Sequence, residues 1–116
     1  MYKVLLVDDE MIFLEFMEKV IDWGAYDCTI CARAMDGHQA VEIIRQEKPE
    51  IIFLDINMSR MNGLEVCEAI RELPFSPRII IVTAHDEFHF AYKAIKLKVF
   101  DYLLKPFDKK ELTDTL

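Results

Sequence analysis

The sequence has 116 residues, the usual length of one folded domain, and 53% of them are hydrophobic, enough to build a core. Its 14 basic and 21 acidic residues give a net charge of −7, which opposes contact with nucleic-acid phosphates, so we do not expect this segment to bind DNA itself. Because no apolar run approaches the roughly 18 residues of a membrane span, the sequence predicts a soluble, cytoplasmic domain without membrane contact.

The first half of the sequence alternates strand and helix patterns. Residues 4–7 form a continuous apolar run, typical of a parallel strand buried on both faces. Apolar side chains four residues apart then predict a helix over 12–21, in two stripes. Residues 28–32 form a weaker strand with the mixed polarity of a sheet edge, and a second helix is predicted around 40–44. The two stripes of the first helix are Ile12, Phe16 and Val20, and Phe13, Met17 and Ile21.

The second half continues the alternation. Its strand runs are 51–54, 79–82 and 99–104, and its helix patterns cover 66–70, 88–95 and a segment that begins near 107–108. Strand and helix repeated five times predict a doubly wound α/β sheet with five helices and right-handed crossovers. The last helix pattern reaches Leu116 without a closing Gly or Pro, so we expect the chain to be the N-terminal fragment of a longer protein.

Three cysteines invite a redox or zinc interpretation. Cys28 and Cys31 match the spacing C-x-x-C, but residues three apart in a strand point to opposite faces, so we do not expect their thiols to converge. No second pair of Cys or His residues completes a tetrahedral zinc site. We therefore interpret these two residues and Cys67 as small buried hydrophobic residues in reducing surroundings.

Polar residues follow the apolar runs at the same point of each strand. Asp8 and Asp9 follow the first strand, Asp55 the third, Thr83 the fourth and Lys105 the fifth. In open α/β sheets, ligands bind in the crevice beyond the carboxyl ends of the strands. We therefore expect these five side chains to meet at one rim of the sheet.

Together these side chains suit metal-assisted phosphoryl chemistry. Three neighbouring carboxylates repel one another unless a proton or a cation lies among them, and Mg²⁺ prefers such oxygen ligands. A carboxylate can attack phosphorus to form an aspartyl-phosphate, while Lys105 supplies positive charge and Thr83 a hydroxyl. Singly, each residue has a simpler interpretation: Asp8 or Asp9 could cap the first helix, Thr83 could be a plain strand residue, and Lys105 a surface charge.

The ordered set of motifs resembles the receiver domains of two-component response regulators, over essentially all of residues 1–116. The resemblance implies a flavodoxin-like five-stranded parallel sheet in the order 2-1-3-4-5 with five helices, an order that the pattern of strands alone cannot supply. The motifs are VLLVDDE at 4–10, AMDG at 34–37, DINM at 55–58 with Asn62-Gly63 behind it, IVTA at 81–84 and DYLLKPF at 101–107.

The resemblance also implies the roles of the residues at the rim. Asp55 would accept a phosphoryl group from the phosphohistidine of a sensor histidine kinase. Mg²⁺ would be held by Asp9, Asp55 and the backbone carbonyl of Asn57, with Asp8 acting largely through water. Lys105 would pair with Asp55 and then with the phosphoryl group. The domain would therefore be a phosphoacceptor switch that catalyses only its own phosphorylation and dephosphorylation.

The response to phosphorylation is implied in the same way. Thr83 would move toward the phosphate and Tyr102 would turn inward to fill the vacated space. The Lys105-Pro106 peptide bond would be cis, and His85 and Asn57 would help to set the lifetime of the phosphate. We expect the active form to dimerise through the face made by the fourth helix, the fifth strand and the fifth helix.

Within the family, the segments 21–23 and 85–97 look most like regulators with an AraC-type helix-turn-helix output domain. A DNA-binding transcription regulator with its output domain C-terminal to this chain is therefore implied. Three positions depart from the family pattern: Ser59 where Pro is common, Asn62 where Asp is common, and Lys98 where Gly is common.

Three alternative functions are weighed against this one. A haloacid-dehalogenase-type phosphohydrolase needs a second Asp two residues beyond the nucleophile, where this sequence has Asn57. A pseudo-receiver would bind partners without being phosphorylated, and the complete set of rim residues argues against it. A flavodoxin-like cofactor binder would carry a flavin, which its absorbance would reveal.

Overall fold

The computed structural model describes all residues except 59 and 85–100, with the side chains of Ala84 and Tyr102 also outside the description. It contains one five-stranded parallel sheet in the order β2-β1-β3-β4-β5, which confirms the predicted flavodoxin-like topology. The strands are β1 (Tyr2–Val7), β2 (Cys28–Ala34), β3 (Ile51–Asp55), β4 (Arg78–Ala84) and β5 (Asp101–Lys105).

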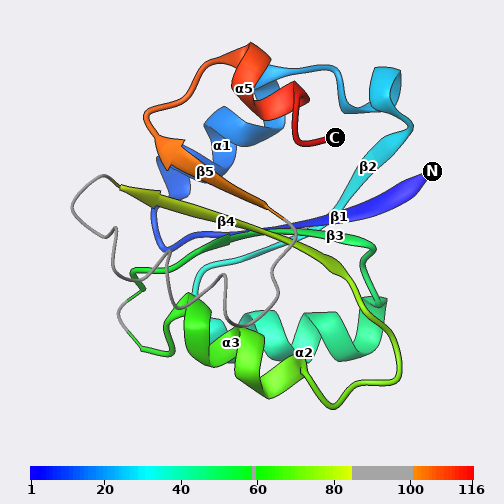
Figure 1. The fold of residues 1–116 in the computed structure, drawn as a ribbon, viewed down its shortest axis with the longest axis vertical. Coiled ribbons are helices and arrows are strands. Elements are labelled where there is room, and N and C mark those ends of the chain that lie inside the picture. Colours follow the sequence, from blue (N-terminus) through cyan, green and yellow to red (C-terminus); the bar gives the residue numbers. More distant parts are fainter. Residues whose placement is uncertain (59, 85–100) are drawn as a thin grey trace.

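Helices cover both faces of this sheet, with α1 and α5 on one side and α2 and α3 on the other (Figure 1). The helix predicted at 88–95 lies outside the described residues. The last helix ends at Thr113, and Asp114 and Thr115 form a turn, so the helix is shorter than the predicted pattern through Leu116. The helices are α1 (Met11–Val20), α2 (Gly37–Glu47), α3 (Gly63–Ile70) and α5 (Lys109–Thr113), with a short 3-10 helix at Trp23–Tyr26.

Alternating side chains of the central strands fill two separate cores. Leu5 of β1 and Leu54 of β3 face α2 and α3, whereas Leu6 and Phe53 of the same two strands belong to the core beneath α1 and α5. Because both faces are covered, the central strands are apolar throughout, which explains the continuous runs in the sequence. No helix in the described part of the chain is both long and apolar enough to cross a membrane.

Edge strand β2 contains an irregularity that the sequence pattern did not predict. Its pairing with β1 passes from Val4 opposite Ile30 to Leu5 opposite Ala32, so Cys31 is the extra residue of a β-bulge. Cys28 and Cys67 are buried and Cys31 is half-buried, and all three are free thiols. Burial is the main cause that raises the pKa of each thiol, to about 12 for Cys67, so none is activated as a nucleophile.

Helix α1 buries one of its two apolar stripes more deeply than the other, whose last residue, Val20, is only partly buried against the core. Met17 is buried and Phe13 is half-buried against the core beneath α1 and α5. In the other stripe, Ile12 is 82% exposed and Phe16 is 42% exposed. Helical spacing predicted the helix correctly, but it does not say which stripe faces the sheet.

Candidate functional site

The carboxyl ends of β1, β3, β4 and β5 lie at one rim of the sheet and carry the predicted polar residues. Asp8 directly follows β1, Asp55 is the last residue of β3, and Lys105 is the last residue of β5. Strand β4 lies between the latter two: Asp55 pairs with Val82, and Lys105 pairs with Ala84. Parallel pairing therefore brings together residues that are up to 97 positions apart in the sequence.

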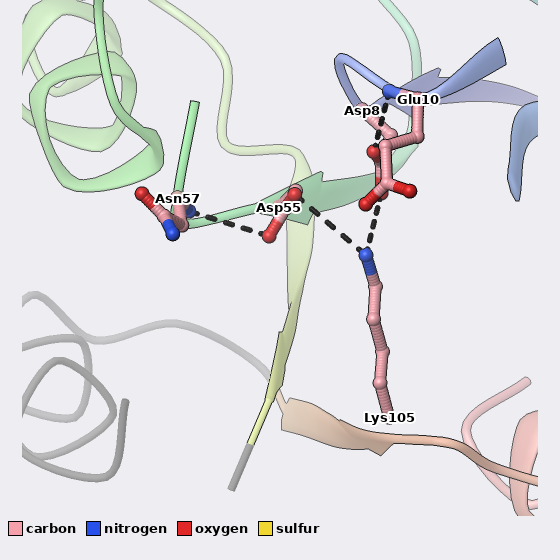
Figure 2. Close-up of polar contacts among 5 residues, drawn as sticks. All are labelled: Asp8, Glu10, Asp55, Asn57 and Lys105. Carbon is pink, nitrogen blue, oxygen red and sulfur yellow. Dashed lines mark hydrogen bonds and ion pairs between the residues drawn. The ribbon is translucent and has the colours of Figure 1, made fainter. Parts of the chain in front are cut away.

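An ammonium group between two buried carboxylates forms the centre of the site. Nζ of Lys105 donates a hydrogen bond to Oδ2 of Asp8 at 2.9 Å and lies 3.7 Å from Oδ2 of Asp55 (Figure 2). Asp8 is only 1% exposed and Asp55 only 5% exposed. Buried charges are costly unless they are paired, so the ammonium of Lys105 compensates part of the charge of both aspartates.

The pKa of Lys105 reflects the same environment. Burial acts to lower the pKa of the ammonium, but the hydrogen bond to Asp8 and the charges of Asp55, Asp8 and Glu10 outweigh it and raise the pKa above its ordinary value. Lys105 therefore carries its charge throughout the physiological pH range.

Short backbone contacts orient both aspartates. Oδ1 of Asp8 accepts a hydrogen bond from the N–H of Glu10 at 2.9 Å, and Oδ1 of Asp55 accepts one from the N–H of Asn57 at 3.3 Å. Each carboxylate is thus held by the backbone two residues further on. Helix α1 begins after Glu10 without a side-chain cap, so the simpler interpretation of Asp8 or Asp9 as its cap is wrong.

A glycine allows the loop after Asp55 to lie close to the end of β3. A Cβ atom on Gly63 would collide with the backbone oxygen of Asp55, and the N–H of Gly63 donates to the oxygen of Ile56 at 2.9 Å. Met61 lies farther along this loop and approaches the start of α2. A Cβ atom on Gly37, the first residue of α2, would collide with the backbone oxygen of Met61. These close approaches need residues without a side chain.

The carboxylates of this rim fit a hard divalent cation. Ligand oxygens of Asp8, Asp9 and Glu10 lie within 4.8 Å of one another. The ammonium of Lys105 joins Asp8 to Asp55 (Figure 2). Four carboxylates thus share the single ammonium that the described contacts show, so the site retains excess negative charge. Oxygen donors with this excess are the ligands that Mg²⁺ prefers.

The structure describes only some of the other predicted site residues. Thr83 is fully buried in β4, one residue beyond the partner of Asp55. Asn57 is exposed at the surface of the loop after β3. Tyr102 is a residue of β5 opposite Ile81, but its side chain is outside the description, as is the whole of His85. The Lys105-Pro106 peptide bond is cis.

Sequence reasoning missed an aromatic ring beside the lysine. Nζ of Lys105 lies 4.1 Å from the centroid of the Phe13 ring. The only signal in the sequence was an aromatic residue one turn after Asp9, at the start of α1. That signal is weak because Phe13 also belongs to an ordinary apolar stripe.

Known proteins share both this sequence and this fold. A family model described as the response regulator receiver domain matches residues 4–116. The chain is 38% identical over 116 residues to an uncharacterized response regulatory protein of Staphylococcus epidermidis, and 38% identical over 112 residues to the transcriptional regulatory protein HptR of Staphylococcus aureus. These matches cover 100% and 97% of this chain but only 45% and 44% of the relatives. The chain therefore spans less than half the length of these curated relatives.

Solved structures agree with the sequence relatives. The REC domain of AraT, a response regulator from Geobacillus stearothermophilus, has a TM-score of 0.92 and 38% identity, over 97% of this chain and 88% of that one. A two component transcriptional regulator AraC from Clostridium phytofermentans has a TM-score of 0.90 and 28% identity, over 100% of this chain and 90% of that one. The resemblance to receiver domains of AraC-type regulators is thus supported. The chain therefore belongs to the response-regulator receiver family.

Proposed function

We propose that this domain is a phosphorylation-dependent switch that accepts a phosphoryl group on Asp55. The observation that carries the proposal is the ammonium of Lys105, held 2.9 Å from Asp8 and 3.7 Å from Asp55 at the rim of the sheet. A cation at this place can neutralise the charge of the incoming phosphoryl oxygens without first having to be recruited. Membership of the receiver family supports the same reaction.

The reaction needs few protein groups. A carboxylate oxygen of Asp55 attacks the phosphorus of a phosphohistidine in a sensor histidine kinase, a new O–P bond forms, and the P–N bond breaks as the imidazole leaves. The N–H of Asn57 holds the other oxygen of Asp55, which leaves the carboxylate oriented for the attack. Lys105 then shifts its contact from the aspartates to the phosphoryl oxygens.

We assign the metal ligands as Asp8, Asp9, Asp55 and the backbone carbonyl of Asn57, with Asp8 acting largely through water. When bound, Mg²⁺ supplies charge neutralisation at the phosphoryl oxygens. Its removal is expected to stop phosphorylation and leave the fold intact, because strands β1 and β3 position Asp8 and Asp55 without it.

The switch would act through residues at the ends of β4 and β5. A phosphoryl group adds about −1.5 to −2 charges and three acceptor oxygens. The hydroxyl of Thr83, one residue beyond the level of Asp55, is drawn toward it, and Tyr102 responds by turning inward. The signal would pass to a C-terminal output domain. Dimerisation through the face made by the helix predicted at 88–95, β5 and α5 stays a prediction, because residues 85–100 lie outside the description.

Intact-protein mass spectrometry after incubation with acetyl phosphate tests the acceptor. The wild-type protein is expected to gain one phosphoryl group only when Mg²⁺ is present. Asp55→Asn should abolish the gain, and Asp114→Asn, which changes an exposed aspartate after α5, should retain it. No gain in a folded wild-type protein would contradict the proposal and favour a pseudo-receiver that binds partners without phosphorylation.

Measurement of the phosphate released from a small phosphate ester separates the proposed switch from an enzyme. A haloacid-dehalogenase-type phosphohydrolase would turn over and release phosphate continuously from small phosphate esters. The residue two positions beyond Asp55 is Asn57, whose amide cannot carry protons as a general acid or base. We therefore propose that the domain catalyses only its own phosphorylation and dephosphorylation.

A further inference from the structure

We propose that Phe13 is a positioning residue whose ring holds the ammonium of Lys105 beside Asp55. The inference rests on the proposed function, because the position of Lys105 matters only if this ammonium meets the phosphoryl group. It goes beyond the family resemblance, which assigns no role to this position of α1.

Phe13 closes the third side of the space around the ammonium. Nζ of Lys105 has Asp8 at 2.9 Å, Asp55 at 3.7 Å and the ring centroid of Phe13 at 4.1 Å. The last distance is well within the roughly 6 Å over which an aromatic face attracts a cation. Two carboxylates and a ring face therefore surround a group that sits at the end of a flexible four-carbon chain.

The ring is itself held in place by other aromatic residues. Phe13 meets Phe107 edge-on, with centroids 5.8 Å apart and an interplanar angle of 89°, and it lies 5.8 Å from Phe16. The edge-to-face contact with Phe107 orients the ring of Phe13 as well as burying it. Phe107 follows Lys105 by two residues, so one ring contacts both the lysine and the start of the connection to α5.

An open pocket lies on the same side and explains why the lysine needs a support. Phe13, Phe16, Phe107, Lys105 and Pro106 line a cavity of about 380 Å³ between α1 and the end of β5. This space is large enough for a lysine side chain to swing away from Asp55. The ring of Phe13 favours the inward position because leaving it gives up the contact between cation and ring.

The expected consequence is a change in rate without a change in metal binding. Replacement of Phe13 by Leu removes the aromatic face, frees Lys105 to enter the cavity, and should slow phosphorylation by acetyl phosphate by about tenfold. The ligands that we assign to Mg²⁺ do not include Phe13, so the dissociation constant of Mg²⁺ should stay within about twofold of the wild-type value.

Four proteins test this inference: wild type, Phe13→Leu, Phe13→Tyr and Tyr26→Leu. Phe13→Tyr keeps the ring and should keep the wild-type rate. Tyr26→Leu removes an exposed aromatic ring that does not line the cavity and has no described contact with Phe13 or the ammonium, so it is the control. If Phe13→Leu does not fold, Phe13→Met provides an unbranched substitute without an aromatic face.

Proton NMR of the Lys105 side chain supplies a readout that a purely structural role would not move. Protons above a ring face are shifted upfield, so the ε-methylene signal of Lys105, assigned by its loss in Lys105→Met, should be upfield in wild type, Phe13→Tyr and Tyr26→Leu only. Loss of both the rate and the upfield shift in Phe13→Leu supports the inference. A slower rate with the shift retained, or a lost shift with the wild-type rate, overturns it.

The two proposals fail in different ways. If wild type gains no phosphoryl group, the proposed function is wrong, although the NMR shift still reports whether the ring holds the lysine. If wild type is phosphorylated and all four proteins react at the same rate, the proposed function stands and the role of Phe13 is wrong.

Discussion

The two faces of the sheet support the candidate site in different ways. On the face covered by α2 and α3, backbone meets backbone: Gly63 approaches the backbone oxygen of Asp55, and Gly37 approaches Met61. On the face covered by α1 and α5, long side chains and rings make the contacts, and a cavity remains beside Lys105. The carboxylate of Asp55, the proposed acceptor, is therefore fixed through its backbone, whereas the ammonium of Lys105 beside it is adjustable. A switch needs both properties, because the acceptor must stay in place while its surroundings respond.

The largest effect is expected on the adjustable side, from Lys105→Met. This change removes the ammonium and leaves Asp8 and Asp55 as buried carboxylates without it, which should lower the free energy of unfolding by about 3 kcal/mol. Added Mg²⁺ should recover part of the loss, since it compensates the same charges. Urea denaturation with and without Mg²⁺ measures both effects, and Lys109→Met at the exposed start of α5 is the control. Equal stability of the two variants would show that Asp8 and Asp55 do not depend on the lysine.

The pH dependence sharpens this comparison. The pKa of Lys105 is raised in the folded protein, mainly because contacts with Asp8 and Asp55 outweigh the opposing effect of burial. The stabilisation by Lys105 is thus complete below the pKa of an unfolded lysine, about 10.4, and is lost as the pH rises through the higher folded value. The difference in stability between wild type and Lys105→Met should be constant from pH 7 to about pH 9.5 and shrink above that range.

A smaller effect is expected on the rigid side, from Gly63→Ala. The added Cβ would collide with the backbone of Asp55 and Ile56, so the β3–α3 connection must move, at a cost of about 2 kcal/mol. Because the displaced atoms belong to the acceptor, phosphorylation should slow as well. Gly24→Ala is the matched control, since a Cβ there meets its nearest atom at an ordinary 3.4 Å. Thermal unfolding that treats the two variants alike would argue against a fixed acceptor loop.

The fold and the centre of the site were predictable because they depend on strand ends. Hydropathy located every strand, and parallel strands bring their carboxyl ends to one rim, so Asp8, Asp55 and Lys105 could be grouped from sequence. The strand order, in contrast, came from the family resemblance. The exposure of Ile12 was not predictable, since spacing along a helix does not say which stripe faces the sheet. The contact between Phe13 and Lys105 depends on how α1 packs against β5, which no local pattern records.

The smallest effect is expected from Asn62→Asp, which separates helix capping from the charge of the site. Asn62 caps α3 by accepting a hydrogen bond from the N–H of Glu65 at 2.9 Å, and Asp can make the same bond. Its negative charge at the start of the helix should stabilise the protein by about 0.5 kcal/mol. Asn62→Ala, which removes the cap, should instead cost about 1 kcal/mol. If α3 and its loop serve only to hold Asp55, phosphorylation rates should follow stability, and Asn62→Asp should be at least as fast as wild type. A more stable but slower Asn62→Asp variant would mean that the added charge reaches the phosphoryl group, and that the rigid side influences the reaction electrostatically as well as through the backbone.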